Sequence, residues 1–357
     1  MMFSKVLQLL MLSALCVAVF ILAGCNASEM VSVPAGTFVM GNSGVGDDAA
    51  APAMDEVPVH PVTLGAYQIG KYDVTNQEYC DVLNWALAQG YLKDSAGASW
   101  AGAGGIYGGG ALQILLDFAD PDCNIEFSGG VFSSKKRPDR PGTTVYPTDT
   151  HPVVDVSWYG AAAYCNWRSQ MDNLTTCYDL TTPDWPLVVA PPTPGGYRLP
   201  TEAEWERAAA WDGNKHWIYG FTEDTLGKAA NRCNDETDGS SYANPLGLKN
   251  RPYTSPVGWF DGMHVSPNGS VTTVNSTSPV GCYDMSGNIW QWVQDWYAPT
   301  YHDAAPRINP PGPAAGVYRV CRGGAWDNSF SICRSACRDA DRPEAAYNDF
   351  GFRIARS

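Results

Sequence analysis

The residues with the greatest capacity for chemistry in this sequence are its eleven cysteines. Deprotonated thiols bind soft metals and act as nucleophiles. Two of them, Cys333 and Cys337, lie four residues apart near the C-terminus. The sequence contains no C-x-x-C pair and its five histidines are scattered, so it lacks the spacing of a zinc site. Two uses of the thiols remain open: a redox centre at Cys333 and Cys337, or disulfides in an exported protein, whose pairing the spacing does not reveal.

A second candidate for covalent chemistry is Cys25, at the end of an N-terminal apolar segment. Lys5 precedes an apolar run over residues 6–22, and the run leads into the tetrapeptide L-A-G-C that ends at Cys25. This tetrapeptide resembles the lipobox of bacterial lipoproteins, in which cleavage precedes the cysteine and the sulfur is then lipidated. We therefore expect residues 1–24 to be a signal peptide and Cys25 to carry the lipid anchor, at a bacterial outer membrane or cell surface. The alternative is a plain signal peptide with an incidental cysteine.

The composition indicates a rigid, loop-rich globular protein. Of 357 residues, 45% are apolar and 12% aromatic, whereas only 17% are charged, and there are 36 Gly and 26 Pro. This mixture argues against disorder and against a coiled coil. Lys and Arg number 23 against 37 Asp and Glu, a net charge of −14. Such an acidic surface repels phosphate backbones, so we expect no nucleic-acid partner.

Local signals predict the elements that must position the reactive groups. Thr75 to Glu78 form a capping box for a helix that ends near Ala88, and a second box at 201–204 starts a helix that ends near Trp211. Ser157 is the expected cap of a helix over 158–168. Near the C-terminus, residues 318–326 and 350–356 are predicted as two strands that flank a long polar segment.

Motifs along nearly the whole chain then point to one family. They are VPAGTFVMG (33–41), HPVVDVSW (151–158), YRLPTEAEWE (197–206), YDMSGNIWQW (283–292), RGGAW (322–326), CRSA (333–336) and GFR (351–353). In this order they resemble the formylglycine-generating-enzyme, or sulfatase-modifying factor, family. The resemblance implies an α+β, C-type-lectin-like fold rich in irregular loops, over residues 25–357. It also makes Trp158, Trp205, Trp290 and Trp292 core residues.

The resemblance does not extend to the catalytic thiols. In the enzymes, two cysteines near the final Gly-Phe-Arg strand hold copper and activate oxygen, and the corresponding positions here fall at Phe330 and Ser335. Neither side chain can supply a thiolate. We therefore expect no catalytic residues and no enzyme activity. The alternative is an oxidase that uses Cys333 and Cys337 in a shifted register.

The family resemblance also implies one partly retained calcium site. Its ligands would be the side chains of Asp284 and Gln291 with the carbonyl oxygens of Gly287 and Ile289. Hard cations prefer such oxygens, although Gln in place of Glu removes a charge. The alternative is a tight turn held by hydrogen bonds. We therefore expect a protein that needs no cofactor, with calcium as the one ion it could hold.

The segment 326–353, called here the C-terminal excursion, carries the functional hypothesis. Some residues of this segment match the family motifs, and other positions lie between them. These intervening positions share no common chemistry and show neither the alternation of a strand nor the periodicity of a helix. These positions are Ser329, Phe330, Ser331, Ile332, Cys337, Asp339, Ala340, Asp341, Arg342, Ala345, Ala346, Tyr347, Asn348, Asp349 and Phe350. The pattern resembles the variable proteins of diversity-generating retroelements, specifically the treponemal variable lipoprotein type. There, adenine-directed mutagenesis of AAC codons never yields Lys, Glu, Gln, Met or Trp, and none of these occurs at the intervening positions.

The sequence therefore predicts a surface-displayed lipoprotein that binds an external protein or cell-surface ligand through these positions, without catalysis. A stiff scaffold that holds both ends of the excursion would limit the entropy cost of binding, as in antibody loops. Phe330, Ile332, Tyr347 and Phe350 are the expected apolar anchors. The expected polar rim consists of Asp339, Asp341, Arg342 and Asp349. A third alternative is a structural envelope lipoprotein with a fixed partner.

Overall fold

The structure is a computed structural model. It describes residues 28–50, 55–137, 146–225, 231–236, 246–248, 250–267, 269, 271–304 and 306–357. The predicted signal peptide and Cys25 lie outside these residues. Within the described ranges, no helix has the length and apolar character needed to cross a membrane.

The three main helices begin where the capping signals predict. Helix α2 spans Asn76–Ala88, α3 spans Trp158–Met171 and α4 spans Glu202–Ala210. Both capping boxes form, with reciprocal bonds between Thr75 and Glu78 before α2 and the same arrangement before α4. Helix α3 runs past the predicted end at residue 168, because it is buried on almost every side and tertiary packing supports its last turn. Short helical turns complete the set: η1 (Gly46–Ala50), α5 (Tyr301–Ala304) and η2 (Phe330–Ile332).

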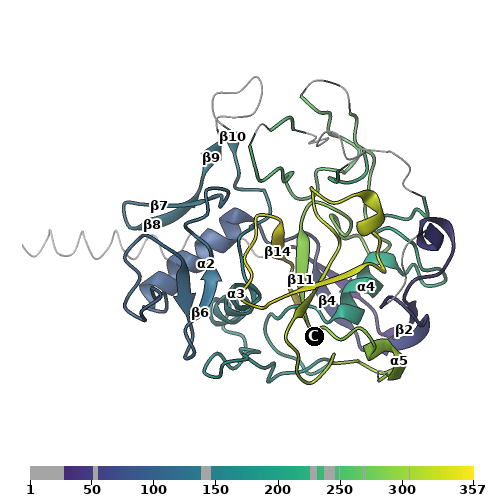
Figure 1. The fold of residues 1–357 in the computed structure, drawn as a ribbon, viewed down its shortest axis with the longest axis horizontal. Helices are drawn as coiled ribbons and strands as arrows, with labels where there is room; N and C mark the ends of the chain where they lie inside the picture. Colours follow the sequence, from purple (N-terminus) through teal and green to yellow (C-terminus); the bar gives the residue numbers. More distant parts are fainter. Residues whose placement is uncertain are drawn as a thin grey trace, which may run out of the picture.

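A four-stranded sheet occupies the centre of the molecule (Figure 1). Its order is β13 (Arg338–Asp341), β12 (Arg319–Arg322), β11 (Trp290–Trp296) and β14 (Phe350–Phe352). Strands β11 and β14 are parallel, and the other two pairs are antiparallel. The first predicted terminal strand, 318–326, forms only in part as β12, and the second, 350–356, is divided into β14 and β15 (Ala355–Arg356). Strand β13 was not predicted, because an arginine buried by an ion pair breaks the alternation that identifies a strand.

The remaining strands form a small sheet and four hairpin-like pairs. The small sheet has the order β1 (Met30–Val33), β4 (Tyr67–Gly70), β15 (Ala355–Arg356). The pairs are β2 (Gly36–Met40) with β3 (His60–Leu64), β5 (Ile106–Gly108) with β6 (Gln113–Leu116), β7 (Ile125–Ser128) with β8 (Val131–Ser134), and β9 (Lys136–Arg137) with β10 (Tyr146–Pro147).

Strand β11 separates two hydrophobic clusters. Trp290 and Trp292 belong to a cluster with residues of α2 and α3, whereas Val293 belongs to a second cluster with Trp205 of α4. In Figure 1, α3 and α4 accordingly lie on opposite sides of β11. Alternate side chains of a strand point to opposite faces, so this short segment is buried on both faces. The prediction that Trp158 and the other motif tryptophans are core residues is confirmed.

Candidate functional site

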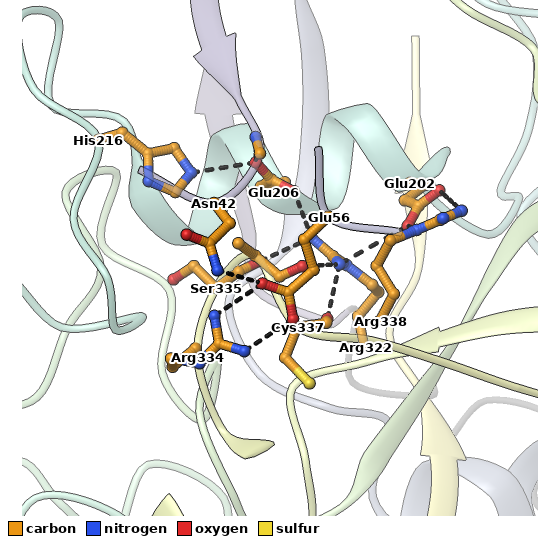
Figure 2. A network of polar contacts seen from close by, with 12 residues as sticks. Asn42, Glu56, Glu202, Glu206, His216, Arg322, Arg334, Ser335, Cys337 and Arg338 are labelled. Atoms are coloured by element: carbon orange, nitrogen blue, oxygen red, sulfur yellow. Dashed lines mark hydrogen bonds and ion pairs between the residues drawn. The ribbon is translucent and has the colours of Figure 1, made fainter. Parts of the chain in front are cut away.

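The first half of the C-terminal excursion is fixed by Arg334. Its guanidinium binds both carboxylate oxygens of Glu56, at 2.8 and 2.7 Å (Figure 2). It also binds Asp48 at 2.8 Å. All three side chains are buried. The paired carboxylates raise the pKa of Arg334 above its usual value despite burial, so the guanidinium stays charged. A fork-shaped, two-point contact of this kind fixes orientation as well as position.

Arg322 fixes the backbone of the same segment. From β12, it donates to the carbonyl oxygens of Ser335 at 2.6 Å, Ala336 at 3.0 Å and Cys337 at 2.6 Å, and it also pairs with Glu206 of α4. Burial alone would raise the pKa of Glu206, but the charge of Arg322 and the bond from His216 outweigh it and lower that pKa to about 2. Because the contacts are to carbonyls, they do not depend on the side chains of the excursion.

Arg338 completes the set and joins the excursion to the start of α4. Its Nε and Nη2 atoms donate to the two carboxylate oxygens of Glu202, at 2.6 and 3.0 Å. Glu202 is buried, yet the charges of Arg338 and Arg322 keep its pKa below the ordinary value. Figure 2 shows Arg322 and Arg338 next to each other and Arg334 on the other side of Glu56, each directed at a carboxylate from another part of the chain.

The second half of the excursion is held by its main chain. The carbonyl oxygens of Pro343, Tyr347 and Asp349 accept hydrogen bonds from the backbone N–H groups of Trp158, Asp155 and Trp290, at 3.1, 2.9 and 2.8 Å. The indole Nε1 of Trp326 donates to the carbonyl of Asn348 at 3.3 Å. The excursion is thus anchored at both ends and along its length without using most of its side chains.

Most predicted binding positions lie on the outside of this anchored backbone. The exposed ones are Ser329, Ser331, Ile332, Asp339, Arg342 and Tyr347. The half-buried ones are Phe330, Ala340, Asp341, Ala346, Asn348 and Asp349. Together, these two groups are called the binding face below.

Three predicted binding positions need correction, because Cys337, Ala345 and Phe350 are buried. Phe350 is the first residue of β14 and its ring lies 4.9 Å from that of Trp292, in the core. Cys337 and Ala345 are members of the same hydrophobic cluster. The composition of the excursion could not separate outward positions from inward ones, since that depends on how it turns against β11 and β12.

The binding face carries a local concentration of negative charge. Burial and then the neighbouring carboxylate of Asp327 raise the pKa of Asp349 to about 7, with smaller contributions from Asp339 and Asp341. The pKa of Tyr347 is also raised, chiefly by Asp341. These shifts place the side chains in one electrostatic environment, although they come from separate parts of the excursion.

The thiols near this surface are poorly suited to metal or redox chemistry. Burial raises the pKa of Cys333 well above its usual value and that of Cys337 to about 12, so both favour the protonated form. Phe330 packs against the cluster around Tyr219, and the Ser335 hydroxyl is buried with no hydrogen-bond partner in the described part of the chain. All nine described cysteines are buried free thiols, so the structure contains no disulfide among them.

The predicted calcium ligands do not fit a calcium ion. The side-chain oxygen of Gln291 accepts bonds from Trp205 and Arg353, both at 2.6 Å, and its nitrogen donates to the carbonyl of Asp284 at 2.7 Å. Arg353 also binds Asp73 at 2.8 Å, so a guanidinium already neutralises this buried region. The Asp284 carboxylate accepts a bond from the backbone of Gly258 at 2.6 Å. The hydrogen-bonded turn is therefore the better description.

Reasoning from sequence missed the acidic partners of the anchoring arginines. Arg322 and Arg334 lie inside family motifs, and this position was a signal that they have a structural role. Nothing local connects them to Glu56 or Glu206, which lie 278 and 116 residues away along the chain.

The fold and this surface define a C-type-lectin-like α+β scaffold that displays a loop on a central sheet. The model of the sulfatase-modifying factor enzyme 1-like domain matches residues 22–357. The chain therefore belongs to the formylglycine-generating-enzyme family.

Similar proteins include both enzymes and a variable protein. A formylglycine-generating enzyme of Thermomonospora curvata is 30% identical over 92% of this chain and 93% of its own. One of Streptomyces coelicolor is 29% identical over 91% of this chain and 88% of its own. Among solved structures, Treponema denticola variable protein 1 superposes with a TM-score of 0.57 at 23% identity, covering 92% of this chain and 94% of that one. At 23% identity, the similarity to the variable protein shows a shared fold.

Proposed function

We propose that this protein is a non-catalytic receptor that binds an external protein ligand through the binding face of its C-terminal excursion. The observation that carries the proposal is that different groups of the excursion hold its backbone and form its surface. Buried arginines and main-chain hydrogen bonds hold the backbone, while the side chains of the binding face are exposed or half-buried. Such a surface can change its chemistry without changing its fold.

The chemistry of the binding face suits recognition of a protein. Phe330, Ile332 and Tyr347 offer apolar contact, and Tyr347 is 49% exposed. Asp339 and Asp341 on β13 add negative charge to the binding face and favour a partner with basic groups. Phe350 no longer counts among the anchors, because it belongs to the core.

Display at a cell surface completes the proposal. Lipidation of Cys25 would anchor the chain at a bacterial outer membrane or cell surface, with the excursion free to meet external partners. The name of Treponema denticola variable protein 1, whose fold is similar, agrees with a diversified excursion. The net charge of −14 continues to argue against a nucleic-acid partner.

A library of excursion variants tests the proposal. The codons of the binding face are replaced by NNC, and the displayed library is selected against hen lysozyme as a probe protein. The matched control library randomises Arg322, Arg334, Arg338, Glu56 and Glu202. We expect most binding-face variants to remain folded and to yield lysozyme binders, and most control variants to be lost. Equal loss of folded members from both libraries would overturn the proposal, as would a binding-face library that yields no binder.

A natural test compares codons 326–353 among isolates of the source bacterium. Changes confined to the binding-face codons, together with a nearby reverse transcriptase and an AAC-rich near-copy of this segment, are the expected result. Identical codons in all isolates would favour the alternative of a structural envelope lipoprotein with one fixed partner.

The second candidate function is an oxidase, favoured by the 30% identity to a named formylglycine-generating enzyme. It would have to use Cys333 and Cys337, whose raised pKa values oppose thiolate formation. Incubation with copper, oxygen, a thiol reductant and a sulfatase-type cysteine peptide, followed by mass spectrometry, distinguishes the two functions. We expect an unchanged peptide; conversion of its thiol to an aldehyde would establish the oxidase.

A further inference from the structure

A cavity of about 590 Å³ lies at one end of the central sheet, where Arg319 of β12 is the register partner of Asp341 of β13. Residues 182–191 and the proline-rich segment 309–316 form its walls, and the last residues of β11 and the first of β12 form its floor. Leu187, Pro311 and Ala315 give the walls an apolar character. None of the binding-face residues lines the cavity.

One buried cation, Arg319, lies in the floor. Its side chain is sandwiched between the indole rings of Trp158 and Trp296, with the guanidinium carbon 3.6 Å from each ring centroid. Nη1 donates to the carbonyl of Gln294 at 2.6 Å, and Nη2 donates to the carbonyl of Asp184 at 3.3 Å. These two acceptors leave part of the five-donor guanidinium unused, including Nε, which has no acceptor in the described part of the chain.

Arg319 has no carboxylate within ion-pair distance in the described part of the chain, in contrast to five other buried arginines. Arg198, Arg322, Arg334, Arg338 and Arg353 each form an ion pair with a buried Asp or Glu. No ion pair joins Arg319 to a carboxylate of the described residues. An uncompensated buried charge is costly, so this position favours an anion. Burial lowers the pKa of Arg319 to about 9, in line with that deficit.

Burial and the neighbouring Glu202 raise the pKa of Asp295, a buried carboxyl that interacts with Arg319, to about 8, so this group favours the neutral form. The charged groups that line the cavity do not neutralise Arg319 either. Both oxygens of Glu204 are bound by Arg198, at 2.6 and 2.8 Å, so this carboxylate is already neutralised. Asp184 is exposed at the rim, where its carboxylate faces solvent and opposes the entry of an anion. The floor therefore offers a positive charge and the walls offer apolar surface.

We propose that this cavity binds an amphipathic organic acid, with its carboxylate on Arg319 and its apolar body against the proline- and leucine-rich walls. The volume lies within the range of about 300 to 1,000 Å³ that is typical of small-molecule sites. The proposal is independent of the binding face, since the two regions share no residues.

Calorimetry with 4-phenylbutyrate and its uncharged analogue 4-phenylbutanamide tests the proposal on the full chain. The two probes have the same shape, so their difference reports the charge. We expect saturable binding of the acid and at least tenfold weaker binding of the amide, because a hydrogen bond to a charged group is the main polar contact. No saturable binding of the acid, or equal affinities for the two probes, would overturn the proposal.

Three variants locate the site. Ala315→Trp fills the mouth from an exposed position and should weaken binding of the acid at least tenfold, while the matched Ala98→Trp, exposed and outside the cavity, should leave it unchanged. Asp184→Asn should strengthen binding several-fold, because it removes the rim carboxylate. Arg319→Met should make the affinities for the acid and the amide equal. If Arg319→Met fails to fold, the other two variants still test the proposal. If neither Ala315→Trp nor Asp184→Asn changes the affinity for the acid, the acid does not bind in this cavity.

Discussion

The anchoring role of Arg334 leads to a quantitative prediction about stability. Replacing Arg334 by Met keeps the length and apolar stem of the side chain but leaves the carboxylates of Glu56 and Asp48 buried without a counter-charge. Breaking a buried ion pair by removing one partner costs about 3–5 kcal/mol. We expect Arg334→Met to lower the free energy of unfolding by that amount, whereas Tyr347→Ala on the binding face should change it by roughly 1 kcal/mol or less.

Guanidinium unfolding followed by tryptophan fluorescence measures both changes through the transition midpoint. The double variant Arg334→Met with Glu56→Gln should recover part of the loss, since it removes one of the two uncompensated charges. A loss below about 1 kcal/mol for Arg334→Met would refute the reasoning, because the excursion would then not depend on its buried anchors. A loss for Tyr347→Ala equal to that of Arg334→Met would refute it as well.

Three further predictions follow from the pKa values and hydrogen bonds. Because the pKa of Asp349 is raised from 3.8 to about 7 in the folded protein, stability should fall as pH rises between these values, and Asp349→Asn should flatten that profile in pH-dependent unfolding. Cys333 and Cys337 should resist iodoacetamide at pH 8 until guanidinium is added, as judged by peptide mass spectrometry; rapid labelling of the native protein would instead favour the oxidase. Calcium should leave the unfolding midpoint unchanged. Gln291→Glu should lower the free energy of unfolding by about 1–3 kcal/mol, because it places a carboxylate oxygen against the Asp284 carbonyl. A calcium-dependent midpoint in the unaltered protein would instead support the metal site.

Much of the fold was predictable because its signals are local. A capping box such as the one at 201–204 involves residues three apart, so it forms wherever the chain allows a helix to begin. The tryptophans of the family motifs were expected in the core, and they lie there. Strand β13 escaped prediction because Arg338 is buried only through its ion pair with Glu202, which is 136 residues away in sequence.

The sequence predicted which segment forms the candidate site, but not which of its side chains are exposed. The interrupted pattern of the excursion marked its boundaries, but not that Phe350 enters the core beside Trp292. The hydrogen bonds of the predicted calcium ligands could not be predicted for a similar reason, because Arg353 comes from the end of the chain to bind the oxygen of Gln291.

The sequence by itself determined the family, the helix starts and the location of the excursion, since each depends on residues that are neighbours along the chain. Tertiary structure alone decided which side chains are exposed, which carboxylates hold the excursion, and that Arg319 lines a cavity without an ion pair to a carboxylate of the described residues. Those properties depend on desolvation and on contacts between distant segments, and neither exists until the chain has folded.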